Sequence, residues 1–201
     1  MKTYKHQIIA SLSLFAVLFM AACGGSDGTD NLGISPFQII NDTTIRLHGE
    51  IDSNTENAFD EVMRQNPNTT LLIFGIAPGS SDDEVNLRVG RKVHQRGLNT
   101  EVEANGEIAS GAVDLFLAGA QRSLGANALV GVHSWSDGSR DATDFPANSP
   151  EHQFYIDYYK SVGFSDQWAS DFYFFTINAA SADDIHWMTA AEIEQYGIET
   201  N

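Results

Sequence analysis

The chain has 201 residues, with 11 Lys and Arg against 27 Asp and Glu, and a formal net charge of −16 at pH 7. A surface this acidic repels a phosphate backbone, so we expect no nucleic-acid partner. The single cysteine excludes an intramolecular disulfide, and no Cys/His cluster has the spacing of a zinc site, so we expect no metal and no cofactor.

Residues 1–22 have the pattern of a lipoprotein signal peptide. Lys2 and Lys5 precede an almost wholly apolar run from Ile8 to Ala22, which is short for a membrane span. Small residues lead directly to Cys23, as a lipoprotein signal peptidase requires, so we expect this cysteine to carry a lipid. The alternative is an ordinary secretory signal followed by an incidental cysteine.

The segment after the signal predicts where the protein resides. Residues 23–33 are expected to form the lipidated cysteine and a polar, glycine-rich flexible tether, which leads into one domain over 34–201. Gly24 follows the cysteine at the position where Asp would favour retention in the inner membrane. By resemblance to Gram-negative lipoproteins, we therefore expect an exported protein, lipid-anchored in the outer membrane and facing the periplasm.

From residue 34 onward, apolar runs alternate with amphipathic stretches, which is typical of a parallel sheet with crossover helices. Expected strands are 44–49, 70–76, 99–104 and 128–132. Expected helices are 54–65, from Ser81 to about Arg96, 110–122, the aromatic-rich 151–176, and a short helix capped by Thr189. Ser81 and Glu84 have capping-box spacing, and 135–150 is expected to be a long polar loop. The fold class is α/β, with a helical C-terminal part.

Three features fall at the carboxyl ends of expected strands, where open α/β sheets build their sites. Gly79-Ser80 forms a turn into a helix, and its backbone amides could hold an oxyanion. Ser110 opens a helix among small neighbours, and His133 leaves a strand, so the two could form a nucleophile and a general base. Asp183 or Asp184 could orient the imidazole.

The order of these pieces resembles the ClpP family of serine peptidases and its periplasmic relatives, within the ClpP/crotonase-like superfamily. The resemblance covers Leu47 to Trp135 and a C-terminal segment. The matching pieces are Leu47–Ile51, Ile76–Gly79, Ala109–Ala112, Leu117–Arg122, Gly131–His133, Met188–Glu192 and Tyr196–Gly197.

The resemblance implies roles position by position. Ser110 falls at the nucleophile and His133 at the general base. The backbone amides of Gly79 or Ser80, and of Gly111, fall at the oxyanion hole. Ser80 stands where the family has a second glycine. The family's aspartate position falls on Ile185, so Asp184, one residue earlier, is the expected triad acid and Asp183 the second choice.

These observations favour an ATP-independent periplasmic serine hydrolase, most simply a peptidase acting on peptide or protein substrates. The alternative is a non-catalytic lipoprotein that keeps the fold for binding or assembly. An acyl-CoA enzyme of the crotonase group is disfavoured, because coenzyme A is not expected in the periplasm.

Two further groups of residues have simpler interpretations. Asp82-Asp83-Glu84 could bind a metal, but acidic residues in a first helical turn explain this run better. The aromatic residues between Phe154 and Phe175 could line a ligand groove. Helix packing, or burial in the interface of a homo-oligomer, is the favoured explanation for them.

Overall fold

The structure, a computed structural model, describes residues 34–200. These residues form a seven-stranded sheet in the order β1-β2-β3-β4-β6-β7, with β5 paired to β4. The predicted signal peptide, Cys23 and the tether lie outside the described residues. No helix among residues 34–200 is long and apolar enough to cross a membrane.

The strands and helices alternate through most of the chain. The strands are β1 (Phe37–Asn41), β2 (Thr44–Leu47), β3 (Leu71–Ala77), β4 (Asn99–Ala109), β5 (Arg122–Leu124), β6 (Leu129–Val132) and β7 (His186–Trp187). The helices are α1 (Thr55–Gln65), α2 (Asp83–Gln95), α3 (Gly111–Leu117), the 3₁₀ turn η1 (Ala142–Asp144), α4 (Pro150–Ser161), α5 (Asp166–Ala179) and α6 (Ala190–Gln195).

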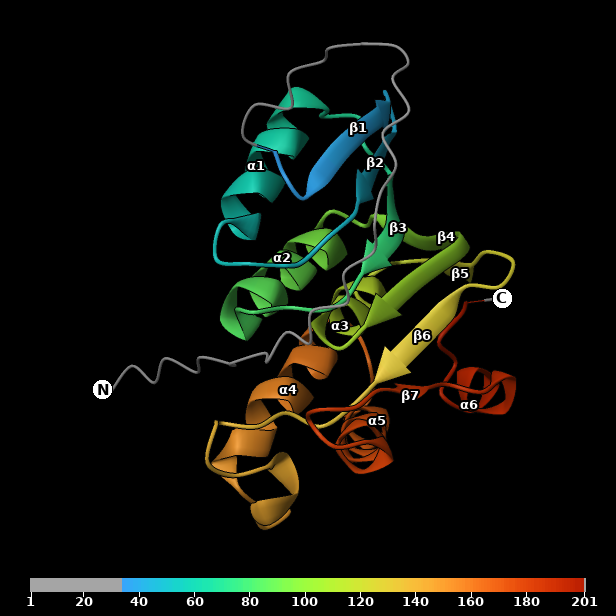
Figure 1. Cartoon of the computed structure of the whole chain (residues 1–201). Coiled ribbons are helices and arrows are strands. Elements are labelled where there is room, and N and C mark those ends of the chain that lie inside the picture. Colours follow the sequence, from blue (N-terminus) through green and yellow to red (C-terminus); the bar gives the residue numbers. More distant parts are fainter. Residues whose placement is uncertain (1–33, 201) are drawn as a thin grey trace, which may run out of the picture.

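The centre of the sheet is parallel and its two ends are antiparallel. β2, β3, β4 and β6 run in one direction, whereas β1 pairs antiparallel with β2 and β7 antiparallel with β6. Figure 1 shows the arrowheads of β3, β4 and β6 at the same edge of the sheet. The loops that follow these three strands therefore meet there, and they contain Gly79, Ser110 and His133.

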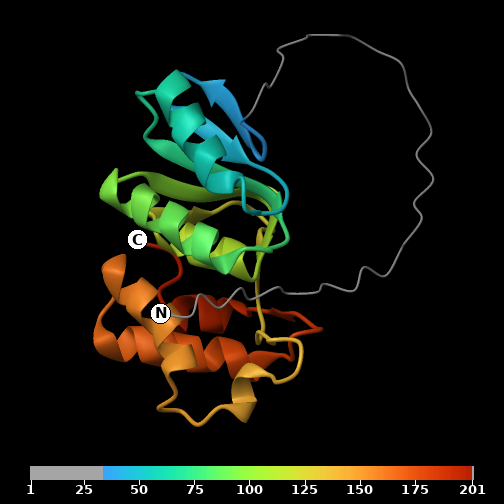
Figure 2. The same ribbon diagram turned by 90° about the vertical axis from the view of Figure 1, so that its left-hand side faces the viewer.

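Helices cover one face of the sheet, as Figures 1 and 2 show for α1 and α2. This face carries the buried strand residues, and the hydrophobic core lies beneath the helices. The opposite face is more polar: Arg46 on β2 forms an ion pair with Glu103 on β4, across Gly75 of β3. The expected α/β fold with a mostly parallel sheet and crossover helices is confirmed.

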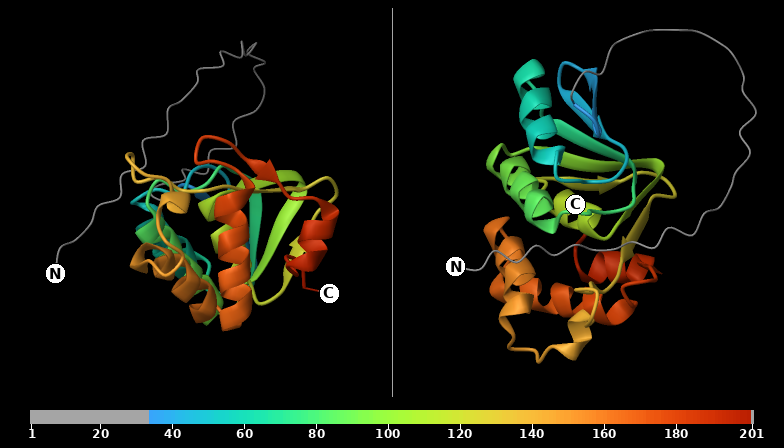
Figure 3. Two further views of the ribbon diagram at one scale, coloured as in Figure 1. Left: turned by 90° about the horizontal axis from the view of Figure 1, so that it is seen from below. Right: turned by 60° about the vertical axis from the view of Figure 1, so that its left-hand side comes forward.

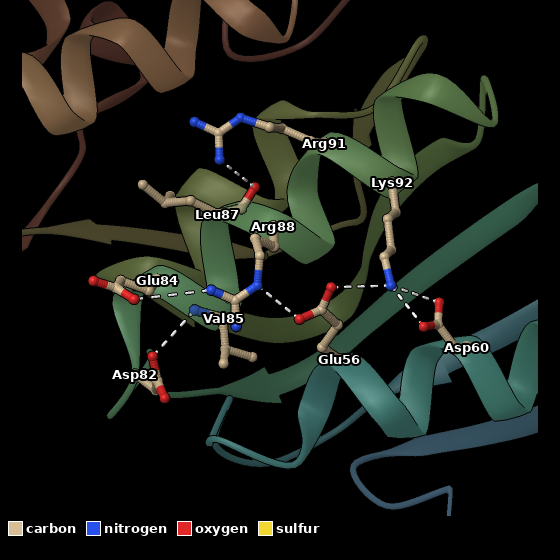
Figure 4. A network of polar contacts seen from close by, with 9 residues as sticks. All are labelled: Glu56, Asp60, Asp82, Glu84, Val85, Leu87, Arg88, Arg91 and Lys92. Atoms are coloured by element: carbon tan, nitrogen blue, oxygen red, sulfur yellow. Dashed lines mark hydrogen bonds and ion pairs between the residues drawn. The ribbon is translucent and has the colours of Figure 1, made fainter. Parts of the chain in front are cut away.

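Ion pairs on the surface join α1 to α2 (Figure 4). Glu56 accepts a hydrogen bond from Arg88 at 2.7 Å and lies 3.0 Å from Lys92, which also binds Asp60 at 2.6 Å. Exposed pairs of this kind contribute little individually. The larger contribution to α1 packing comes from its buried apolar face, which includes the predicted Ala58, Val62 and Met63.

The helical C-terminal part also follows the prediction. Helices α4 and α5 pack side by side, and α6 lies near β6 and β7 on the other side of the strands (Figure 3). Thr189 and Glu192 form a complete capping box at the start of α6. The indole of Trp168 on α5 donates to the Tyr196 carbonyl at 2.8 Å, which ties α6 to the helical layer.

Several boundaries differ from those predicted. Asp82, not Ser81, caps α2, because its side chain accepts from the Val85 amide at 3.1 Å. The helix expected over 110–122 ends at Leu117, and the chain then forms β5. Strand β4 continues past residue 104 to Ala109, with Asn105 at φ +59° beside a shift in register. β1 and β7 were not predicted.

Candidate active site

Ser110 lies at a sharp turn between β4 and α3. Its backbone has φ +53° and ψ −132°, a region that non-glycine residues adopt at a cost of about 1–3 kcal/mol. The Ser110 amide donates to the Gly131 carbonyl of β6 at 3.0 Å, which ties the turn to the neighbouring strand. The Ser110 side chain caps no amide of α3. The hydroxyl is therefore not used as a helix cap.

Gly79 approaches Ser110 from the end of β3. It has φ +135°, and a Cβ added there would lie 2.8 Å from the Ser110 Cβ and 3.3 Å from its Oγ. Any larger residue would displace the serine or distort the turn. The requirement for glycine at residue 79 therefore comes from close contact with Ser110 as well as from backbone conformation.

Three backbone amides around Ser110 are available to a ligand. The N–H groups of Gly79, Ser80 and Gly111 donate to no hydrogen-bond partner among residues 34–200. Gly79 and Gly111 are buried, and an unpaired buried amide is costly unless something accepts its hydrogen bond. The amides predicted for the oxyanion hole are therefore brought together beside Ser110 with their donor capacity unused.

Ser80 directs its side chain toward Gly111 and Asp83. Its hydroxyl donates to the Asp83 carboxylate, and a Cβ added to Gly111 would lie only 2.2 Å from the Ser80 Oγ. The Ser80 side chain thus fills the space left by the missing Gly111 side chain. The serine at this position is accommodated by packing between the β3–α2 turn and the first turn of α3.

His133 follows β6 and lines the same cavity as Ser110. Burial lowers the pKa of its imidazole below the ordinary 6.5; the hydrogen bond to Ala182 and the charge of Asp83 oppose this effect. The ring is therefore mostly neutral at pH 7, the state that a general base requires. Its Nδ1 lies 3.2 Å from the Ala182 carbonyl oxygen, so Nδ1–H can donate there and leave Nε2 free to accept a proton.

The structure does not bring Asp184 to His133. The Asp184 side chain is exposed, and its Oδ1 accepts the Ile185 amide at 2.8 Å. Asp183 is also exposed but lines the cavity. Neither carboxylate hydrogen-bonds to the imidazole, and the Ala182 carbonyl occupies the place expected for an acid. Asp184 therefore does not make the hydrogen bond to His133 that its predicted role requires, because its carboxylate accepts the next amide of its own loop instead.

The cavity beside Ser110 has a volume of about 640 Å³. Its walls come from the β3–α2 turn, α3, the loop after β6, α4 and α5. Its aromatic lining residues are Trp135, from the loop after β6, and Tyr155, Tyr159, Phe172 and Tyr173, from the aromatic segment for which helix packing or a subunit interface was the favoured explanation. Tyr155 and Tyr173 stack with ring centroids 5.7 Å apart. These rings form cavity wall as well as core, so the ligand-groove interpretation of the segment gains support.

Two carboxylates in this cavity were not predicted as site residues. Asp83 accepts the Tyr155 hydroxyl at 2.6 Å, and Asp114 accepts the Tyr159 hydroxyl at 2.6 Å. Burial raises the pKa of Asp114 from 3.8 to about 7; the Tyr159 hydrogen bond lowers it and the charge of Asp83 raises it. No three His, Cys, Asp or Glu side chains among residues 34–200 are arranged to hold a metal ion.

Asn86 supports the turn from within α2. It is fully buried, and its Nδ2 donates to the Gly111 carbonyl at 2.7 Å, while its Oδ1 has no partner among the described residues. The bond fixes the first peptide units of α3, next to the Gly111 amide. A polar residue at a buried helical position is the sequence signal that could have identified it.

Comparisons with known proteins support the fold. No family model matches the sequence, and no curated protein matches it. Among solved structures, ClpP1 from Listeria monocytogenes is 16% identical with a TM-score of 0.51, over 78% of this chain and 88% of that chain. The 1510-N membrane-bound stomatin-specific protease, in a mutant form with a substrate peptide, is 18% identical with a TM-score of 0.50, over 78% and 72%.

The effect of Asp114 on stability can be measured directly. Because its folded pKa lies above 3.8, protonation stabilises the native state at low pH, and this stabilisation is lost as the pH rises toward 7. In Asp114→Asn, the amide oxygen can still accept the Tyr159 hydroxyl but the side chain does not ionise, so the variant should not lose this stability as the pH rises. The variant's unfolding free energy relative to wild type should therefore increase from pH 5 to pH 8, by at most roughly 3 kcal/mol.

Urea denaturation at the two pH values provides the measurement. Glu84→Gln, which removes an exposed carboxylate from the same side of the domain, is the matched control and should show no such increase. An Asp114→Asn difference that is equal at pH 5 and pH 8 would contradict the raised pKa.

At identities below 20%, the structural matches speak for architecture alone. Over the 78% of the chain that they cover, they show a ClpP-like fold.

Proposed function

We propose that this protein is a serine hydrolase, most simply a peptidase, in which Ser110 is the nucleophile. The observation that carries the proposal is the strained Ser110 turn, set among three unused amides and lining the same cavity as His133, whose lowered pKa keeps the imidazole mostly neutral. Among the described residues, the Ser110 hydroxyl and the imidazole share no hydrogen bond, so the proposed proton transfer needs the two side chains to approach each other when substrate binds. Backbone strain alone does not imply catalysis. Its coincidence with free donors and a base in one cavity favours acyl transfer over a packing role.

The proposed reaction proceeds in two stages. The Ser110 Oγ attacks the substrate carbonyl carbon while His133 Nε2 accepts its proton, and the carbonyl oxygen becomes an oxyanion. The amides of Gly79 or Ser80, together with Gly111, would stabilise that charge. The C–N bond then breaks as His133 protonates the leaving amine. Water, deprotonated by His133, releases the acyl group and regenerates Ser110.

The imidazole would be oriented by the Ala182 carbonyl, which accepts from Nδ1. A carbonyl fixes the tautomer but carries no full charge, so it stabilises an imidazolium less than a carboxylate would. Asp184 could supply that charge only after its loop rearranged. The same deficit favours the alternative function, a binding protein that keeps the fold without catalysis.

Labelling with a fluorophosphonate, which reacts with activated serines, tests the hydrolase. Wild-type full-length protein in detergent should react, Ser110→Ala should lose the label, and His133→Ala should react at least about 100-fold more slowly. Because the pKa of His133 is lowered, the wild-type rate should fall only below pH 6.5. Ser81→Ala, an exposed serine at the start of the α2 segment, is the matched control and should label normally. A folded wild-type protein that stays unlabelled would favour the binding function.

We also propose that the protein is exported and anchored in the outer membrane through a lipid on Cys23, so that it works in the periplasm without an ATP-driven partner. The support is the basic, apolar and small-residue pattern that ends at this cysteine. Cells that express the full chain should incorporate labelled fatty acid into it, and Cys23→Ala should abolish that incorporation. Equal incorporation in both proteins would exclude Cys23 as the lipidation site.

A further inference from the structure

The cavity beside Ser110 is lined by both acidic and aromatic side chains. Its lining contains four carboxylates, those of Glu50, Asp83, Asp114 and Asp183, and neither Lys nor Arg. Asp83 and Asp114 come from different helices, and their charges interact closely enough for Asp83 to raise the pKa of Asp114. Two carboxylates that share a partly dry cavity without a cation destabilise each other.

The Lys and Arg side chains that form ion pairs within residues 34–200 do so away from this cavity. Arg88 and Lys92 pair with α1, Arg140 with Asp137, and Lys160 with Asp157. Arg91 lies over the Tyr158 ring, 5.4 Å from its centroid, and is not part of the cavity lining. Within residues 34–200, no cationic side chain forms an ion pair with Asp83 or Asp114.

We propose that this cavity holds the substrate side chain next to the scissile bond, and that Asp83 and Asp114 select a cationic side chain, lysine or arginine. This inference rests on the proposed hydrolase function. It identifies the substrate class as acyl compounds, most simply peptides, with a basic residue on the acyl side of the bond. The four lining carboxylates act against an acidic residue there.

The depth of the pocket suits such a side chain. Asp114 lies four residues after Ser110, one turn of α3 and roughly 6 Å farther along the helix axis. An acyl group bound at Ser110 can therefore reach Asp114 with a side chain of several carbons, which lysine and arginine have. Ser110, Asp114 and Asp83 all line the one cavity.

The hydrogen bonds of the two carboxylates leave room for a cation. Tyr159 donates to Asp114 Oδ1, whereas Oδ2 accepts no hydrogen bond from the described residues. Tyr155 and Ser80 hold Asp83 in place. The rings of Tyr155, Tyr159 and Tyr173 would surround the aliphatic stem and present faces that attract a cation. The charge of the cavity, its aromatic walls and the unused acceptor oxygen of Asp114 thus agree on a basic side chain.

The test uses two peptide phosphonates that phosphonylate an active serine and differ only in one side chain. One carries the 4-aminobutyl group of lysine, and the other carries the uncharged butyl group of norleucine. At pH 8, full-length wild-type protein in detergent should react with the aminobutyl reagent at least about tenfold faster, the ratio that about 1.4 kcal/mol of discrimination produces. Asp114→Asn should reduce this ratio severalfold, whereas Glu84→Gln should preserve it.

The outcomes separate this inference from the hydrolase proposal. Equal rates for both reagents in wild type, or a faster reaction with butyl, would overturn the cationic pocket and leave the hydrolase intact. Failure of a folded wild-type protein to react with either reagent or with a fluorophosphonate would overturn both. If Asp114→Asn does not fold, the wild-type ratio still decides, and Asp83→Asn supplies the second variant.

Discussion

The turn at Ser110 depends on how β4 is held between β3 and β6. Parallel pairing places Ala109 opposite Gly131, and the next amide, that of Ser110, bonds to the Gly131 carbonyl at 3.0 Å. This bond keeps a serine in a backbone conformation that costs about 1–3 kcal/mol. Gly79 at the end of β3 leaves space for the turn because it has no Cβ. Ser110, the free amides and the cavity that Ser110 lines all depend on this three-strand edge.

Much of the sheet could be predicted from apolar runs, because β3 and β6 carry the uninterrupted apolar sequences typical of parallel strands that are packed against helices. The missed strands have physical reasons. β7 has two residues, and β1 is an edge strand whose partner is β2. β5 has only three residues, Arg122–Leu124, and directly follows a run of small and apolar residues that fits a helix equally well. These strands form because they pair with neighbouring strands in the folded protein, and their sequences show little of the apolar periodicity that predicts a strand.

Some residues of the candidate site could likewise be predicted from the sequence, whereas others could not. Ser110, His133 and Gly79 follow strand ends, so the parallel topology alone brings them to one edge. Asp83 resembles an ordinary first-turn carboxylate, and Asp114 resembles a polar position on a short helix. Only the packing of α4 shows that tyrosine hydroxyls, those of Tyr155 and Tyr159, contact both. Asp184 illustrates the reverse case, because a suitable residue near the expected position bonds to its own loop instead.

A crystal structure of the full-length protein after reaction with the aminobutyl phosphonate would test the central claim most directly. The account predicts phosphorus bonded to Ser110 Oγ, with the phosphonyl oxygen about 2.7–3.1 Å from the amides of Gly79 or Ser80 and of Gly111. The aminobutyl group should extend to Asp114 and Asp83. Phosphorus on another residue, or a phosphonyl oxygen that points away from these amides, would contradict the assignment of the Ser110 turn as the catalytic centre.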